Sequence, residues 1–116
     1  MIDHVQIAKL LQGCRFHFTS ERELQDGVAA ALRKGDIVFE RELSISPGDR
    51  PDFMVGEIAI EIKVKGGVGW VTRQLFRYAE NPRVKAIVLV TSKASHKAMP
   101  AEMNGRPVSV VYPYNL

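Results

Sequence analysis

The residues best suited to chemistry lie in one short stretch, RPDFMVGEIAIEIKVKG, at residues 50–66. Two strand-like runs meet there at a turn and carry Asp52, Glu61 and Lys63. Side chains of a strand alternate between faces, so Glu61 and Lys63 share one face. A two-residue turn puts Asp52 on that face as well. If the turn is Gly56 and Glu57, Asp52 lies opposite Glu61 with Cβ atoms ~5 Å apart. A three-residue loop would turn Asp52 to the other face.

Two facing carboxylates predict a site for a divalent cation. Like charges opposite each other destabilise a hairpin, and a cation held between them reverses that interaction. Mg²⁺ prefers carboxylate and carbonyl oxygens, so the backbone carbonyl of Ile62 is a further candidate ligand. The ion also keeps several waters, which a phosphate can replace. Lys63 could neutralise a phosphoryl oxygen or assist an attacking water. The alternative interpretation is an amphipathic strand with a solvated polar face.

Composition is that of an ordinary globular protein, and we expect one domain over residues 1–116. The chain is 46% hydrophobic and 25% charged, and its net charge of +3 favours an anionic partner such as nucleic acid. No apolar run could span a bilayer and no signal-peptide pattern is present, so we expect a cytoplasmic protein with no membrane partner. The single cysteine, Cys14, excludes an internal disulfide, and the three histidines lack the spacing of zinc ligands.

Hydrophobic periodicity and turn residues predict the elements that position these residues. The order of the predicted helices and strands along the chain favours an α/β fold with a central mixed sheet flanked by helices. The hairpin should be antiparallel, and the strand after the crossover helix parallel to a neighbour. The segment 95–107 is expected to be a loop or a short helical turn. Helices are expected over residues 1–13, 19–35 and 66–82, and strands over residues 36–45, 51–55, 57–65, 84–92 and 108–114.

Pro51-Asp52, nine residues before Glu61-Ile62-Lys63, resembles the P-D…(D/E)-x-K signature of the PD-(D/E)xK nuclease superfamily. The resemblance implies a restriction-endonuclease-like α-β-β-β-α-β core. It also implies that Asp52 and Glu61 are metal ligands and catalytic residues, and that Lys63 is the catalytic lysine. With the motifs described next, it covers residues 20–91, and only the substrate-recognising insertions of larger relatives are missing.

The segment SEREL at residues 20–24 looks like the helix of Holliday-junction resolvases that adds an acidic residue to the metal site. Two glutamates compete for this role. Glu23 is expected to form a capping box with Ser20. Glu21 projects along the core-facing stripe of the helix, so we prefer Glu21 as a metal ligand and catalytic residue. A first-turn glutamate that is favoured only by the helix dipole is the alternative.

The segment QLFRY at residues 74–78 resembles the Q-x-x-x-Y motif of RecB-type nucleases, which implies that Gln74 lies near the active site. Tyr78, one helical turn away, could pack in the core or contact nucleic acid. Trp70 is expected to be a core or interface anchor rather than a platform for bases. His96, with its neighbouring lysines, forms either a phosphate-binding loop or a solvated basic loop. The expected nucleic-acid contacts are Lys65, Arg73, Arg77, Tyr78, Lys93 and Lys97.

The sequence thus predicts a Mg²⁺-dependent nuclease, with Mn²⁺ able to substitute, that hydrolyses DNA by metal-activated water. Branched or junction DNA is one expected substrate, and the resemblance implies 5′-phosphate and 3′-hydroxyl products. Cutting both strands with so small a chain would call for a homodimer. Three alternatives remain open: a RecB-like nuclease acting on ends or flaps, a nuclease-fold module that binds nucleic acid without turnover, and a structural α/β protein.

Overall fold

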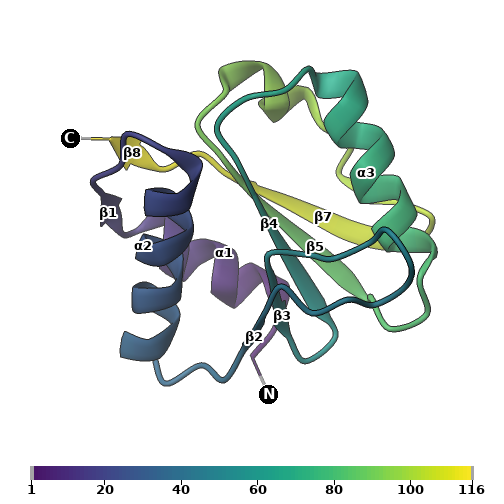
Figure 1. The fold of residues 1–116 in the computed structure, drawn as a ribbon, viewed down its shortest axis with the longest axis horizontal. Coiled ribbons are helices and arrows are strands. Elements are labelled where there is room, and N and C mark those ends of the chain that lie inside the picture. Colours follow the sequence, from purple (N-terminus) through teal and green to yellow (C-terminus); the bar gives the residue numbers. More distant parts are fainter. Residues whose placement is uncertain (1, 116) are drawn as a thin grey trace.

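The computed structural model describes residues 2–115 and folds them into three α-helices around a mixed β-sheet (Figure 1). The helices are α1 (His4–Gln12), α2 (Glu21–Lys34) and α3 (Val68–Glu80), and a 3₁₀ helix, η1, spans Ala94–Ala98. The strands are β1 (Arg15–Phe16), β2 (Glu40–Arg41), β3 (Phe53–Val55), β4 (Ile58–Lys63), β5 (Ala86–Thr91), β6 (Glu102–Met103), β7 (Arg106–Val111) and β8 (Tyr114–Asn115). None of the helices in this described part is long and apolar enough to cross a membrane.

The main sheet has six strands in the order β2-β3-β4-β5-β7-β6. Its centre is parallel, because β4 pairs with β5 and β5 with β7 in the same direction, whereas β2, β3 and β6 pair antiparallel with their neighbours. A separate two-stranded sheet pairs β1 with β8. The predictions of an α/β fold, an antiparallel hairpin and a parallel strand after α3 are therefore confirmed.

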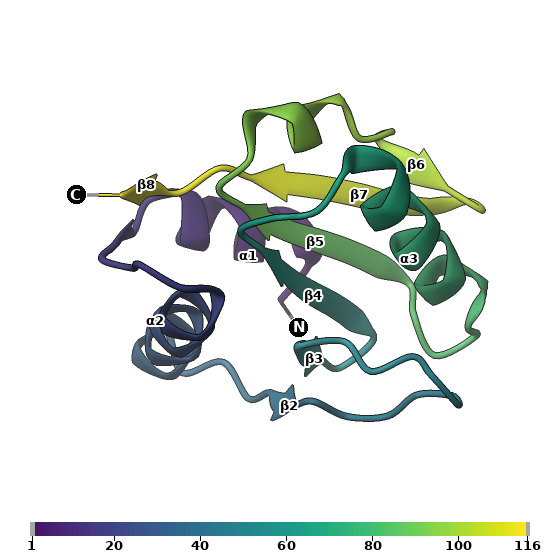
Figure 2. The ribbon, with the colours of Figure 1, turned by 45° about the horizontal axis from the view of Figure 1, so that its top comes forward.

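Helices cover both faces of the sheet (Figure 2). On one face, Ile60 and Ile62 of β4 pack with residues of α1 and α2, including Leu11 and Val28. On the other face, Ala59 of β4 joins the buried residues of α3. Alternate residues of β4 therefore enter different halves of the core, as the period of two requires. Figure 1 shows β4 and β5 side by side at the centre of the sheet.

One predicted strand and one predicted loop differ from the structure, and both differences have a backbone cause. The run 36–45 forms only the two-residue edge strand β2, because Asp36 and Glu42 adopt positive φ angles of 57° and 53°, which interrupt an extended chain. The segment 95–107 is not only a loop or helical turn, since it also contributes β6 and the start of β7. Asn104 and Gly105, both with positive φ, form the tight turn between these two strands.

Candidate active site

The turn between β3 and β4 sets the register of the hairpin. Phe53 pairs with Ile60, and Gly56, with φ of 56°, starts the two-residue turn. Continuing this register by one position places Asp52 opposite Glu61, and the backbone N–H of Asp52 donates a hydrogen bond to Glu61 Oε1 at 3.3 Å. The predicted juxtaposition of the two acidic residues in the second register is therefore confirmed.

The polar face of β4 is buried. All six residues of the strand are buried, and Glu61 and Lys63 expose only 3% and 8% of their surface. This face lies under α3, since Ala59 contacts the same half of the core as Val71 and Leu75 of that helix. The alternative of a solvated amphipathic strand is thus wrong.

Pro51 gives the end of the hairpin an unusual hydrogen-bonding pattern. The register places Pro51 opposite Ile62, and a proline has no N–H to donate to the Ile62 carbonyl. The N–H of Ile62 instead donates to Asp52 Oδ2 at 2.7 Å. The carbonyl of Lys63 accepts from Ser92 on the β5 side, so the Ile62 carbonyl points the other way, towards Asp52. The predicted backbone ligand, the Ile62 carbonyl, therefore lies on the same edge of β4 as Asp52.

Glu61 lies at the centre of a buried hydrogen-bond network. Its Oε2 lies 3.0 Å from Lys63 Nζ, and its Oε1 accepts from the Tyr78 hydroxyl at 3.0 Å. The side-chain amide of Gln74 donates to the Tyr78 oxygen at 3.1 Å, while Gln74 Oε1 is buried and has no hydrogen-bond partner among the described residues. The predicted pair Gln74 and Tyr78 thus connects α3 to the acidic residues of the hairpin.

Burial makes ionisation of both carboxyl groups unfavourable. Burial, and then the negative charge of Glu61, raise the pKa of Asp52 to about 7. Burial also raises the pKa of Glu61, although the Lys63 ammonium and the Tyr78 hydroxyl act in the opposite direction. For Tyr78, burial and then Glu61 raise the phenol pKa, so its hydroxyl stays protonated and remains a donor. A bound cation would favour the ionised form of both acids.

Helix α2 contributes two side chains to the same end of β4. Glu21 Oε1 accepts from the N–H of Val64 at 3.3 Å, and Gln25 donates to Asp52 Oδ1 at 3.2 Å. The two residues lie one helical turn apart and so share a face, a signal that could have predicted Gln25. Ser20 caps α2 as expected, but the predicted capping box is wrong in its second half, because the Glu23 carboxylate accepts from the N–H and hydroxyl of Thr19 and not from the N–H of Ser20.

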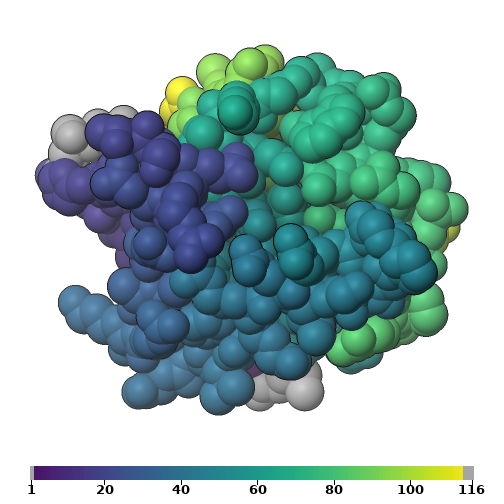
Figure 3. Space-filling model, viewed as in Figure 1, coloured from purple at the N-terminus to yellow at the C-terminus, as the bar shows by residue number. Residues whose placement is uncertain are grey.

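A hollow of about 380 Å³ opens beside these residues. Glu21, Lys63, Lys65, Gly66 and Trp70 line it, between α2 and the start of α3. Asp52 and Glu61 do not line it, and Lys63, which is paired with Glu61, is the residue shared by the hollow and the acidic pair. Figure 3 shows α2 and the segment leading to β3 covering much of one side of the molecule.

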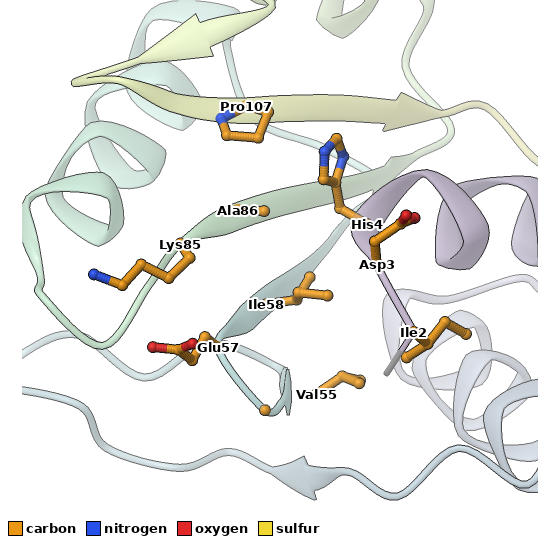
Figure 4. Close-up of a pocket in the computed structure, with 10 residues that line it drawn as sticks. Ile2, Asp3, His4, Val55, Glu57, Ile58, Lys85, Ala86 and Pro107 are labelled. Carbon is orange, nitrogen blue, oxygen red and sulfur yellow. The ribbon is translucent and has the colours of Figure 1, made fainter.

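A second cavity of about 350 Å³ lies at the other end of the sheet (Figure 4). Ile58 and Ala86, the first residues of β4 and β5, border it together with His4, Glu57 and Lys85. Ile58 and Lys63 are the first and last of the six residues of β4, so the five steps between them, at roughly 3.3 Å each, separate this cavity from Lys63. This cavity therefore contains none of the predicted catalytic residues.

The predicted nucleic-acid contacts differ in their surroundings. Lys65 and Arg73 are exposed, while the exposed Arg77 forms an ion pair with Asp49 at 3.0 Å. Lys93 follows the end of β5, which is aligned with the end of β4. The exposed Lys97 lies 4.1 Å from the centroid of the Tyr112 ring.

Tyr78 requires a correction, because it is only 1% exposed and its hydroxyl is bound to Glu61. In this structure it orients an acidic residue and does not reach the surface where nucleic acid could contact it. Of the two interpretations that the sequence left open, core packing is the one observed.

His96 is neither solvated nor free to bind phosphate. It is fully buried, and its Nε2 lies 2.8 Å from the Gly66 carbonyl while Nδ1 lies 2.7 Å from the Thr91 hydroxyl. Trp70 is not a core residue either, since 53% of its surface is exposed. Sequence patterns gave no sign of the His96 contacts, which depend on how η1 packs against the start of α3.

The donor set suits a hard divalent cation, although it includes only two acidic side chains. Among residues 2–115, no three His, Cys, Asp or Glu side chains lie close enough to form a metal-binding group. The Asp52 and Glu61 carboxylates and the Ile62 carbonyl provide three oxygen donors, the kind that Mg²⁺ prefers. Glu21, the third acid that was predicted, borders the hollow and binds the Val64 N–H without completing such a group.

Comparisons of the chain with protein-family models, with curated proteins and with solved structures gave no match. The functional proposal therefore depends on the residues and geometry of this chain.

Proposed function

We propose that this protein is a Mg²⁺-dependent nuclease that hydrolyses phosphodiester bonds of DNA. The observation that carries the proposal is the meeting of Asp52, Glu61 and Lys63 at the end of β4, where burial raises the pKa of both carboxyl groups. Perturbed carboxyl groups beside a lysine and an open hollow are typical of catalytic sites. We also propose a restriction-endonuclease-like topology, for which the order α2-β2-β3-β4-α3-β5 is the support, and a cytoplasmic location.

The chain provides the ligands for the metal and holds them in place. Asp52, Glu61 and the Ile62 carbonyl would hold Mg²⁺, which supplies a water of lowered pKa and polarises the scissile phosphate. Gln25 and the Ile62 N–H fix the orientation of the Asp52 carboxylate through hydrogen bonds at 3.2 and 2.7 Å. The Tyr78 hydroxyl does the same for Glu61.

Lys63 provides a cation where negative charge develops during phosphodiester hydrolysis. Its ammonium lies 3.0 Å from Glu61 and borders the hollow, so it can donate to a phosphoryl oxygen or to the attacking water. The exposed Lys65 lies on the same rim and can bind the phosphate on the next nucleotide. One small domain offers a single site of this kind, and we therefore propose a symmetric homodimer for cutting two strands.

Specific contacts also support two of the alternatives. The chain of hydrogen bonds from Gln74 through Tyr78 to Glu61 favours a RecB-like nuclease acting on ends or flaps, whose motif these residues resemble. The bonds that engage Lys63 and both oxygens of Glu61 within the protein favour a module that binds nucleic acid without cutting it.

The test is cleavage of labelled four-way junction, flap, single-stranded and linear duplex DNA in Mg²⁺, in Mn²⁺ and in chelator. Wild-type protein is compared with Lys63→Met and Asp52→Asn, and with Glu23→Gln as a matched control at an acid outside the site. Metal-dependent cleavage that only the first two variants lose supports the proposal. Tight binding without cleavage in either metal would refute it and favour the binding module. Cleavage that survives Lys63→Met would refute the role of that lysine.

A further inference from the structure

Trp70 lies where the hollow of the candidate active site meets the surface. It borders the hollow with Lys63 and Lys65, and 53% of its surface is exposed to solvent. It belongs to the first turn of α3, a helix whose inner face is filled by smaller aliphatic residues and Tyr78. A large aromatic side chain in this position contributes little to the core. Its place at the mouth of a hollow lined with charged residues leaves it accessible to a ligand bound there.

Specific contacts fix the surroundings of Trp70. The Lys63 ammonium lies 4.9 Å from the centroid of its ring. Gly66 adopts a φ of 103° and lies so close that a Cβ at this position would be 3.6 Å from the ring. The Gly66 carbonyl can only accept a hydrogen bond, so the buried His96 Nε2, 2.8 Å away, carries the proton and donates it. The peptide beneath the indole is therefore held by a fully buried side chain.

Positively charged side chains lie beside the exposed ring, and one of them, Lys63, is paired with Glu61. Lys63 and Lys65 line the hollow with one acid, Glu21, and Arg73 is exposed one turn further along α3. An aromatic platform with cations beside it matches a nucleotide, since the base can stack on the ring while its phosphates meet the cations. An apolar protein partner would not need these cations.

We propose that Trp70 stacks on an unpaired base next to the scissile phosphate, and that the substrate is DNA with single-stranded nucleotides at the cleavage point. This inference rests on the proposed nuclease function, because that function defines where the scissile phosphate lies. Inside a regular duplex the faces of each base are covered by its neighbours, whereas an unpaired base can leave the stack and lie on an aromatic ring. A flap, fork or junction therefore fits the site better than continuous duplex.

Because Trp70 is the single tryptophan of the chain, intrinsic fluorescence reports on this residue alone. The first measurement is a fluorescence titration of the protein with single-stranded, flap and blunt duplex oligonucleotides in chelator, which prevents cleavage. We expect strong quenching by the first two and little by the duplex. Equal quenching by all three would overturn the inference. A change in Trp70 fluorescence that depends on protein concentration and not on DNA concentration would also overturn it, because it would indicate an interface between copies of the chain.

Variants then separate stacking from charge. Trp70→Ala should weaken binding of the flap substrate, measured by fluorescence anisotropy of labelled DNA, by about 5- to 150-fold, and Trp70→Phe should restore part of it. Phe76→Ala is the matched control, because Phe76 is an exposed aromatic residue of the same helix that does not border the hollow.

The results also distinguish this inference from the proposed function. Mg²⁺-dependent cleavage with unchanged flap affinity in Trp70→Ala would overturn the stacking role and leave the nuclease standing. Stacking and Trp70-dependent binding without cleavage in any metal would support the platform and refute the nuclease.

Discussion

Replacing Asp52 with asparagine should stabilise the protein at alkaline pH, although it removes a proposed metal ligand. The pKa of this carboxyl rises from 3.8 to about 7 on folding, chiefly because of burial. A folded-state pKa above the unfolded value means that the native state holds the proton more tightly. The associated stability is therefore complete below about pH 4 and is lost as the pH rises through 7.

The pKa difference of about 3 corresponds to at most about 4 kcal/mol of unfolding free energy. Solvent reaches part of the Asp52 side chain, so we expect roughly 1–3 kcal/mol for Asp52→Asn at pH 8. An asparagine can keep the existing geometry, because its carbonyl can accept from Ile62 while its amide faces Gln25, whose own amide can rotate. The advantage of the variant should vanish near pH 4.

The assay is urea unfolding followed by far-UV circular dichroism from pH 4 to 9 in chelator. Glu80→Gln, which removes an exposed carboxylate at the end of α3, is the control and should show no comparable change with pH. If Asp52→Asn is destabilising by the same amount at every pH, then ionisation of Asp52 does not lower the unfolding free energy, and the inference from its raised pKa is refuted.

Three further changes test other parts of the site. Saturating Mg²⁺ at pH 8 should raise the melting temperature of the wild type but not of Asp52→Asn, measured by differential scanning calorimetry. At a free Mg²⁺ concentration of 100 times Kd, the wild type should gain about 2.7 kcal/mol of unfolding free energy. Tyr78→Phe removes the donor to Glu61 and should cost about 1–3 kcal/mol in urea unfolding. The cost should be larger at high pH than at low pH, because the charged form of Glu61 then loses its hydrogen bond. Gly66→Ala should cost about 1–3 kcal/mol through its φ of 103°, and it should alter Trp70 fluorescence while leaving metal-induced stabilisation intact.

Local periodicity was enough to predict that Glu61 and Lys63 share a face of β4. The position of Asp52 opposite Glu61 depends on the two-residue turn after β3, which was one of the turns that the sequence left open. Their burial could not be predicted in this way. It depends on the packing of α3 over the polar face of β4, and a period of two describes a buried polar face and a solvated one equally well.

Residues that act through tertiary contacts were the ones that sequence patterns missed. His96 is 30 positions from Gly66, and only the parallel pairing of β4 and β5 brings η1 to the start of α3. Trp70 was expected to be an anchor in a core or interface, because composition alone does not show that α3 has already filled its inner face. The edge strand β6 is different, since Asn104-Gly105 is a strong hairpin signal that was present in the sequence.

Unfavourable features gather at one end of β4, and their coincidence is the strongest argument for function. The buried carboxyl group of Glu61 lies beside the partly buried one of Asp52, Pro51 cannot donate to the Ile62 carbonyl, and Gln74 Oε1 is buried with no partner among the described residues. An apolar pair in place of Asp52 and Glu61 would be neutral or stabilising by general experience with buried charges. The rest of β4 and β5 is an unbroken parallel ladder of buried residues. In the proposed function a cation and a phosphate would satisfy these groups at the end of β4, and this is the expected relation between locally unfavourable features and a binding site.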